Sequence, residues 1–330
     1  MDLEDILPVD PLVPTVEYVG ASQTPFTVPW AKGRVQLCTG FNSRRAQHDD
    51  LFIDRAAFQD TASAPLRYRE CQITSIRDES GTDIANSSEN RSFAIGASVG
   101  GSFLGASARG SYEKNVRDNR NTSNISVRAD HVCGQIEVVQ VPQLAKAAVR
   151  LLNTSADPIK EFRQMYGDFY VAGFRVGAVN STIVSGKLAN KSFFEAKRAE
   201  VKVKVLFATI HKSVNDVSSS ASDEGGLNVA AFDSLTGFYS NFTARTYEDS
   251  LQAGEVASAN KQRAMTIAAR AADVLWKEFS MGGDQSACIY QNVVDRLCDR
   301  GLVTELLLAP FATLREYQSV VSRRLSFSRH

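Results

Sequence analysis

Residues 166–178 read Tyr-Gly-Asp-Phe-Tyr-Val-Ala-Gly-Phe-Arg-Val-Gly-Ala, and the organisation of the whole chain can be followed outward from this stretch. Two segments with helical spacing of apolar residues precede it. The first runs from Leu144 to Leu151, and the second opens at Pro158, a residue suited to the first turn of a helix, and reaches Met165. The stretch itself reads as a strand, so the chain passes here from a helical cluster into a sheet.

Strict alternation along the chain predicts further strands, because neighbouring side chains of a strand point to opposite faces. The alternating segments are residues 66–77, 92–103, 125–130 and 199–207. Apolar stripes with helical spacing lie at Ala264 to Leu275 and at Tyr290 to Leu297, and Gly301 is placed to end the latter helix. Strands and helices do not alternate regularly, so the sequence predicts an α+β fold with a mostly antiparallel sheet.

Composition excludes several classes of protein. The 330 residues include 37 Lys and Arg and 37 Asp and Glu, and this neutral balance argues against nucleic acid as a partner. Hydrophobic residues make up 43% of the chain, which is enough for a sizeable core. No window approaches the ~20 apolar residues of a spanning helix, so any entry into a bilayer is expected to use β-structure. The five cysteines are far apart and are expected to be reduced thiols.

Catalytic and metal-binding patterns are sparse. The histidines at 48, 131, 211 and 330 make no metal-binding spacing, and His131 beside Cys133 is interpreted as a strand histidine with a buried thiol. Residues 96–100, Gly-Ala-Ser-Val-Gly, match the nucleophile elbow of serine hydrolases, which would make Ser98 a nucleophile. The elbow should open a helix, but Gly100 is followed by Gly101 and small residues continue to alternate. We therefore expect no enzyme, no cofactor and no metal, and keep a hydrolase using Ser98 as the weaker alternative.

Two regions of the chain have the pattern of a hairpin with one apolar face. In the first, Ser92 to Phe103 alternates, a charged segment follows at 113–120, and a second alternating arm returns at 124–133. In the second, Ala199 to Thr209 is followed by a polar tip at 211–226 and a return arm through 227–245. Transmembrane β-strands need about 9–11 residues, so these arms are long enough to cross a bilayer. An ordinary antiparallel sheet with one face on the core is the alternative.

The stretch at 166–178 resembles the signature of the membrane attack complex/perforin (MACPF) family, Tyr-Gly-Thr-His-Phe/Tyr followed by a strand that ends in Gly-Gly. Tyr166, Gly167, Tyr170 and Gly177 match this signature. Asp168 and Phe169 replace the Thr-His pair, and Ala178 replaces the second glycine of the Gly-Gly pair. Residues 37–42 are similar to an early Gly-Tyr-Asn segment of fungal and bacterial members, and residues 301–310 resemble the family's closing strand. The chain therefore looks like a short member of fungal or bacterial type, with one MACPF-like domain over residues 1–330.

The resemblance implies a bent, twisted four-stranded antiparallel sheet flanked by helix clusters, in which Gly173 and Gly177 permit the bend. It also implies a pore-forming protein that assembles into a ring on a lipid membrane and inserts two amphipathic β-hairpins per subunit into a barrel. The inserting segments would lie within residues 85–133 and 187–245. The residues expected to face lipid are Phe93, Ile95, Val99, Phe103, Val201, Val203, Val205 and Phe207. A non-lytic binding or assembly protein of the same fold is the alternative.

The ends of the chain carry expectations about location and partners. Residues 1–30 are rich in proline and are expected to be extended, and residues 322–330 are expected to form a short basic tail. The acidic start of the chain has no apolar run, so we expect synthesis without a signal peptide, in the cytoplasm or with non-classical release, and action at a target membrane. Because the MACPF-like region leaves no room for a targeting domain, we also expect a partner of the aegerolysin type to supply membrane recognition.

Overall fold

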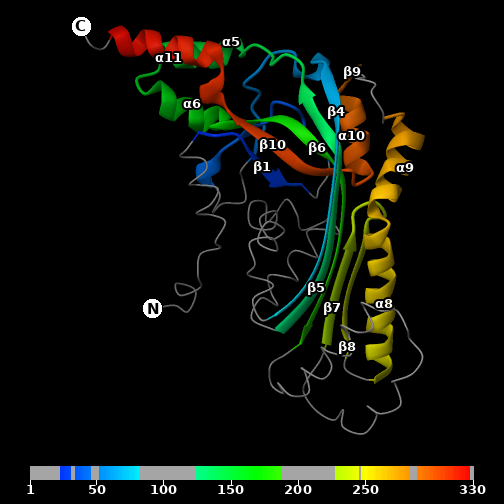
Figure 1. Cartoon of the computed structure of the whole chain (residues 1–330). Helices are drawn as coiled ribbons and strands as arrows, with labels where there is room; N and C mark the ends of the chain where they lie inside the picture. Colours follow the sequence, from blue (N-terminus) through cyan, green and yellow to red (C-terminus); the bar gives the residue numbers. More distant parts are fainter. Residues whose placement is uncertain are drawn as a thin grey trace, which may run out of the picture.

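The computed structural model describes residues 23–30, 34–45, 52–81, 123–186, 227–244, 247–281 and 288–327. Its centre is an antiparallel sheet in which the described strands run in the order β1-β10-β6-β5-β4-β9, with β2, β3, β7 and β8 joined to it at the side (Figure 1). The strands are β1 (Phe26–Pro29), β2 (Gly40–Phe41), β3 (Phe52–Ile53), β4 (Leu66–Gly81), β5 (Ser123–Val138), β6 (Phe169–Gly186), β7 (Leu227–Asp233), β8 (Phe238–Ala244), β9 (Cys288–Ile289) and β10 (Val303–Pro310). The predicted α+β fold with a mostly antiparallel sheet is confirmed, whereas a count of four strands is not.

The helices form two groups at different ends of the sheet. They are α5 (Lys146–Thr154), α6 (Pro158–Tyr166), α8 (Tyr247–Met265), α9 (Ile267–Phe279), α10 (Gln291–Asp299) and α11 (Arg315–Phe327). Helices α5, α6 and α11 lie together at one end, which we call the helical end (Figure 1). Helix α8 lies along β6, β7 and β8 toward the opposite end, and α9 continues it to β5 and β6. No helix among the described residues combines the length and apolar composition needed to cross a membrane.

The helix boundaries follow from capping chemistry that the sequence carries. Helix α6 begins at Pro158, and the carboxylate of Asp157 accepts a hydrogen bond from the Lys160 amide at 3.2 Å, as an N-cap does. It ends at Gly167, whose φ of 91° lies in the left-handed region. Helix α10 is followed by Gly301 with φ 67°. Both helices stand where the sequence predicts them.

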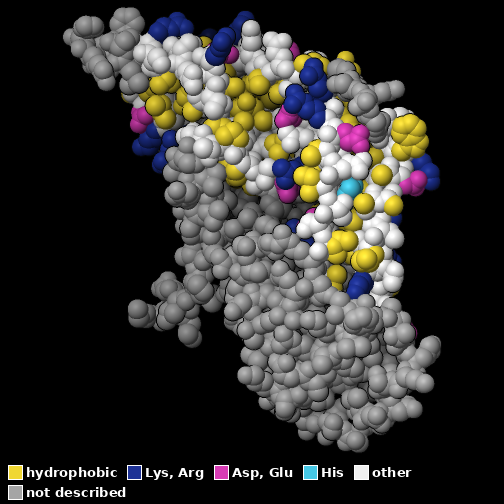
Figure 2. Space-filling model, in the orientation of Figure 1, with side chains coloured by type: hydrophobic (Ala, Val, Ile, Leu, Met, Phe, Trp, Pro, Cys, Tyr) yellow, Lys and Arg dark blue, Asp and Glu magenta, His cyan; other side chains and the backbone are white. Residues whose placement is uncertain are grey.

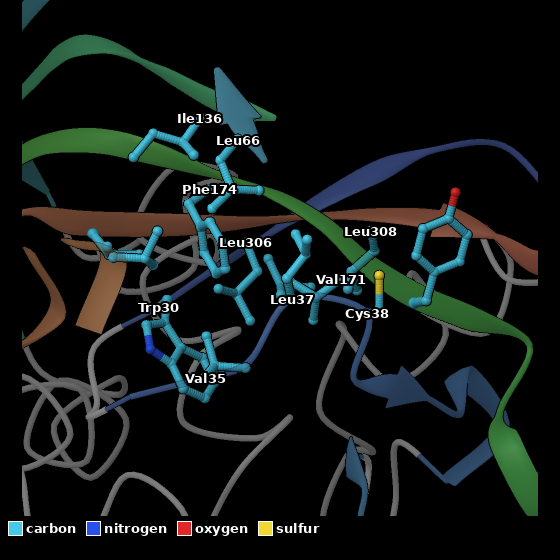
Figure 3. Packing of buried hydrophobic residues seen from close by; sticks show 14 of the residues in the cluster. Trp30, Val35, Leu37, Cys38, Leu66, Ile136, Val171, Phe174, Leu306 and Leu308 are labelled. Carbon is cyan, nitrogen blue, oxygen red and sulfur yellow. The ribbon is translucent and has the colours of Figure 1, made fainter. Parts of the chain in front are cut away.

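Strand β5 buries one face, as its alternation predicts, whereas the side chains of Arg69 to Ile76 on β4 are exposed or partly exposed on both faces. On β5 the side chains of Val127, Ala129, His131 and Cys133 are buried, and the residues between them are partly exposed. Leu66, Ile136, Phe174 and Leu306 come from four different strands and meet in one core with the segment that carries Trp30 and Leu37 (Figure 3). This core lies at the half of the sheet nearer the helical end.

Three expectations need correction. Residues 322–327 belong to α11 and do not form a tail, because the helix that starts at Arg315 continues to Phe327. The region 227–245 is not one return arm, because a turn at 234–237 divides it into β7 and β8, which pair with each other. In the stripe predicted from Ala264 to Leu275, Ala272 is exposed. The end of the N-terminal region that the structure describes includes β1, which pairs with β10.

Candidate functional site

A row of β-bulges crosses the sheet at the level of Val176 on β6. Val176 pairs with Gly134 of β5 on one side and with Val303 of β10 on the other, and Gly134 pairs with Glu70 of β4. Next to these pairs, each of the three neighbouring strands holds more residues than the strand it pairs with. The unmatched residues are Cys71 and Gln72 on β4, Cys133 on β5 and Thr304 on β10. We call this row the bulge line. A bulge bends its strand and increases its twist, so bulges at one level explain why the sheet curves there (Figure 1).

Glycines allow the strands to approach closely at and near the bulge line. A Cβ atom on Gly177 would overlap the carbonyl oxygen of His131 on β5. A Cβ atom on Gly134 would likewise overlap the ring of Tyr68. Gly173, four residues before Gly177, lies against the carbonyl of Ile136. The sequence reasoning singled out Gly173 and Gly177 and missed Gly134, although an isolated glycine in an alternating strand is itself a signal for a bulge or a close approach.

The backbone groups freed by the bulges have hydrogen-bond partners. The hydroxyl of Tyr68 donates to the Cys133 carbonyl at 2.9 Å, and the Trp30 amide donates to the Thr304 carbonyl at 2.7 Å. The Gly177 amide donates to the carbonyl of Leu302 at 2.8 Å. Burial raises the pKa of the Tyr68 phenol, so the hydroxyl remains a donor at physiological pH. The bulge line is therefore a built feature of the sheet, since buried groups left unpaired would be costly.

A buried polar cluster fastens α8 and α9 to the sheet just beyond the bulge line. Its members are Asn180 of β6, Asp233 at the end of β7, Thr236 in the following turn, Asn260 of α8 and Arg270 of α9; we call it the polar clamp. Arg270 donates to both oxygens of Asp233, at 2.7 and 2.9 Å, and Asn180 donates to the same carboxylate at 2.8 Å. Asn180 donates to the Asn260 side-chain carbonyl at 3.0 Å, and Asn260 donates to that of Asn180 at 3.1 Å. Strand, turn and both helices are thus joined by one network.

Asn260 adds contacts to the backbone of two strands. Its amide nitrogen lies within hydrogen-bonding distance of the Ser181 carbonyl at 3.0 Å, the Thr182 hydroxyl at 2.9 Å and the Phe232 carbonyl at 3.3 Å. The side chain is fully buried between Ala257 and Ala264 on the inner face of α8. Sequence reasoning missed this residue. The available signal was an asparagine three residues after one alanine and four before another, on an otherwise apolar helical stripe.

The clamp holds a buried ion pair. The side chain of Asp233 is 1% exposed and that of Arg270 is 24% exposed. Burial acts to raise the pKa of the Asp233 carboxyl, but the hydrogen bonds from Arg270 and Asn180 outweigh burial and hold the pKa below its usual value. The carboxylate is therefore charged at physiological pH, and its charge is balanced by the guanidinium from α9.

The interpretation of His131 and Cys133 as structural residues fits their surroundings. The Nδ1 atom of His131 lies 2.7 Å from the Thr74 hydroxyl, and burial lowers the pKa of the imidazole. Burial raises the pKa of the Cys133 thiol to about 12. In the part of the chain that the structure describes, no three His, Cys, Asp or Glu side chains gather as metal ligands. Ser98, the candidate nucleophile, lies outside the described residues.

The signature residues lie where α6 passes into β6. Tyr166 and Tyr170 are buried, and their rings lie in an aromatic cluster with Phe162, Phe58 and Phe311. The Cα of Gly167 faces the backbone of Phe41 so closely that a side chain would not fit. The signature residues therefore mark the junction between the helical end and the sheet.

The predicted lipid-facing residues, from Phe93 to Phe103 and from Val201 to Phe207, all lie outside the described residues. What the structure does describe is where their segments are attached. Residues 82–122 join β4 to β5, whose described pairing ends at Gly81 with Asn124. Residues 187–226 join β6 to β7, whose pairing ends at Gly186 with Leu227. Both segments thus leave the sheet at the same end, away from the helical end (Figure 1).

Comparisons with known proteins find only low similarity to solved structures. No protein-family model and no curated protein matches it. Among solved structures, it is similar to GNIP1Aa from Chromobacterium piscinae, with 13% identity and a TM-score of 0.33 over 91% of this chain and 55% of that one. It is also similar to a putative cell invasion protein with a MAC/Perforin domain from Bacteroides thetaiotaomicron, with 11% identity and a TM-score of 0.31. That match covers 92% of this chain and 62% of the other, so the chain spans less than two thirds of both proteins.

Proposed function

We propose that the chain is a pore-forming protein of the MACPF type, which assembles into a ring on a target membrane and inserts two hairpins per subunit. The observation that carries the proposal is the attachment of the two amphipathic segments. Each is joined at both ends to an antiparallel strand pair, β4 with β5 and β6 with β7, and both leave at one end of one sheet. These strands would be the four-stranded sheet that the resemblance implies. Extension of both strand pairs into these segments would turn the segments into two adjacent hairpins.

The edge of β4 away from β5 supports assembly through strand pairing. Among the described strands, β9 pairs with β4 only at Leu66 and Arg67, and no other described strand pairs with this edge. Ile73 and Ile76 on the same part of β4 are 58% and 44% exposed. An open edge is a template for another strand, and hairpins in lipid leave no backbone group unpaired only when they join their neighbours. The absence of net charge lets copies of the chain approach one another without strong repulsion.

The polar clamp and the bulge line are the features of the structure that would have to change during insertion. Helices α8 and α9 cover β6 and β7, the strands from which the second segment leaves. The clamp holds both helices on this part of the sheet through the ion pair of Asp233 with Arg270 and through Asn260. Insertion would require the sheet to straighten at the bulge line and the clamp to yield, and the energy for both would come from pairing and burial in the assembled ring.

The test uses two adjacent residues on opposite faces of the first segment. Val99→Asp places a charge on the proposed lipid face and should abolish dye release from liposomes, because a charged side chain facing lipid costs about 2–4 kcal/mol near the bilayer midplane. Ser98→Asp places the same charge on the proposed lumen face and should leave release intact. The liposomes contain phosphatidylcholine, sphingomyelin and cholesterol, with and without an aegerolysin-type protein, and rings are sought by electron microscopy.

The same pair separates the alternatives. If Ser98→Asp abolished dye release and Val99→Asp did not, a hydrolase that uses Ser98 would be favoured. The pore-forming interpretation would then be contradicted. Loss of release in both variants, with folding intact by circular dichroism, would refute the assignment of the two faces. If the unaltered chain bound liposomes without releasing dye under any of these conditions, the non-lytic binding protein would be favoured. Release that needs no added protein would remove the expected partner.

A further inference from the structure

A cavity of about 380 Å³ opens at the helical end of the molecule, between α6, α11 and the short turn Ser43–Arg45. Its apolar wall is formed by Phe311, Val321 and Ile159, and Ile159 is 41% exposed. Two arginines, Arg44 from the turn and Arg163 from α6, line the same cavity. Figure 2 shows basic side chains around this end of the molecule, with hydrophobic side chains between them. The volume and the mixture of an apolar wall with a few polar groups are typical of small-molecule sites.

Buried polar side chains hold the backbone around both arginines. Asn42 accepts a hydrogen bond from the Arg44 amide at 3.1 Å and donates to the Arg163 carbonyl at 3.3 Å, so one side chain ties the two segments together. The carboxylate of Asp168 accepts from the amide and the hydroxyl of Ser43, at 2.8 and 2.6 Å. Asn42 and Asp168 are 5% and 8% exposed. The positions of the two arginine backbones are therefore fixed before any ligand arrives.

Asp168 also connects the turn to the apolar wall. Its own amide donates to the Phe41 carbonyl, and its carbonyl accepts from the Phe311 amide at 3.0 Å. This residue is one of those at which the chain departs from the family signature, and its carboxylate is engaged with Ser43. The departure thus has a structural role, namely to place the turn that carries Arg44.

The charges in the cavity are not balanced. Neither Arg44 nor Arg163 forms a side-chain ion pair within the described part of the chain. Asp168, the acidic residue among those that line the cavity, offsets one of the two positive charges. Tyr317 and Gln318 from α11 add polar groups to the lining of the cavity. Burial raises the pKa of the Tyr317 phenol, which therefore stays protonated and can donate a hydrogen bond.

We propose that this cavity binds a small organic anion with an aromatic or short apolar body, such as an aryl phosphate or aryl carboxylate. Arg44 and Arg163 contact the anionic group, because guanidinium forks match phosphate and carboxylate oxygens. The apolar body packs against Phe311, Val321 and Ile159. The cavity lies at the end of the molecule opposite the attachment of the two amphipathic segments. The site does not depend on the proposed pore-forming function.

The test is calorimetric titration of the full-length chain with phenyl phosphate. Phenyl phosphate should bind more tightly than inorganic phosphate, which lacks the apolar body, and than benzyl alcohol, which lacks the charge. Arg44→Gln and Arg163→Gln should each weaken binding about 10- to 100-fold, as expected for the loss of charge-assisted hydrogen bonds. Arg150→Gln on the exposed surface of α5 is the matched control and should bind as the unaltered chain does. Val321→Phe should also weaken binding by filling the cavity.

Three results would overturn the proposal. The first is no binding of phenyl phosphate or benzoate to the unaltered chain. The second is binding that survives Arg44→Gln and Arg163→Gln together, or that survives Val321→Phe if the arginine variants fail to fold. The third is arginine-dependent binding to vesicles containing phosphatidic acid without binding of free phenyl phosphate, which would assign the cavity to a lipid headgroup. Retained phenyl phosphate binding in a chain that releases no dye would support the site while the pore proposal failed.

Discussion

The polar clamp can be tested with Arg270→Met. This change removes the charged partner of Asp233 from a buried ion pair and keeps much of the apolar length of the side chain at position 270. Breaking such a pair costs about 3–5 kcal/mol when the remaining charge is fully buried. Here Arg270 is 24% exposed, so water reaches one side of the pair. Asn180 and Thr236 also continue to donate to the Asp233 carboxylate. We therefore expect the free energy of unfolding to fall by about 2–3 kcal/mol at pH 7, somewhat below the fully buried range.

The pH dependence of this loss identifies its cause. In the unaltered chain the pKa of Asp233 is lowered, so its contribution to stability is present above the unfolded pKa of about 3.9 and disappears as the pH falls through the folded pKa. Without Arg270, burial is the largest remaining influence and raises the folded pKa of Asp233. The destabilisation by Arg270→Met should then be greatest near pH 7 and should shrink as the pH falls through the raised folded pKa of Asp233, where the carboxyl takes up a proton.

The assay is urea unfolding followed by far-ultraviolet circular dichroism at pH 7 and pH 4.5. Lys277→Met is the control on the same helix, because Lys277 pairs with Asp273 at the surface and its loss should cost no more than about 0.5 kcal/mol. Adding Asp233→Asn to Arg270→Met should restore part of the lost stability by removing the unbalanced charge. The reasoning would be refuted by a loss in Arg270→Met no larger than in the control, or by a double variant no more stable than Arg270→Met alone.

Three other predictions concern the bulge line and its surroundings. Gly177→Val should lower the free energy of unfolding by more than about 3 kcal/mol, because the valine side chain would meet the neighbouring backbone. Gly254→Ala on α8 has open space around it and should raise the free energy of unfolding by up to about 1 kcal/mol. Both changes are measured by urea unfolding. Tyr68→Phe should cost about 1–3 kcal/mol in the same assay, since the carbonyl of Cys133 loses its donor, and no loss would mean that this bond is dispensable. At pH 8 a thiol reagent should modify the exposed Cys71 in the folded chain and spare Cys133, whose pKa is about 12, as peptide mapping would show; equal modification would contradict the burial of Cys133.

The elements of the fold could be predicted where the pattern is local. Pro158 and Gly301 mark helix ends by their own backbone chemistry, and the alternation on β5 reports a buried face because one side of the sheet meets the core. The division of residues 227–245 into two strands was missed. The turn there is held by Asp233, and the partner that fixes this residue, Arg270, lies far along the chain.

The candidate site was harder to predict because its parts belong to different strands and helices. Gly177 could be singled out from the stretch at 166–178, but the level at which its neighbour Val176 meets Gly134 and Val303 depends on the registers of three strand pairs. Asn260 and Arg270 look like ordinary residues of a helix surface until β6 and β7 are placed against them. Long-range pairing of this kind leaves no periodic trace in the sequence.

The bulge line has a further consequence for how the two halves of the sheet can change. The strands pair in one register on one side of Val176 and in another register on the other side. The unmatched residues at the bulge line take up the difference between the two registers. A residue inserted into β5 beyond this line would reset pairing only toward Ser123 and would leave the contacts of Ile136 and Phe174 in place. The half of the sheet that carries the two amphipathic segments is therefore a replaceable module, which could diverge or be grafted between relatives without redesign of the core at the helical end.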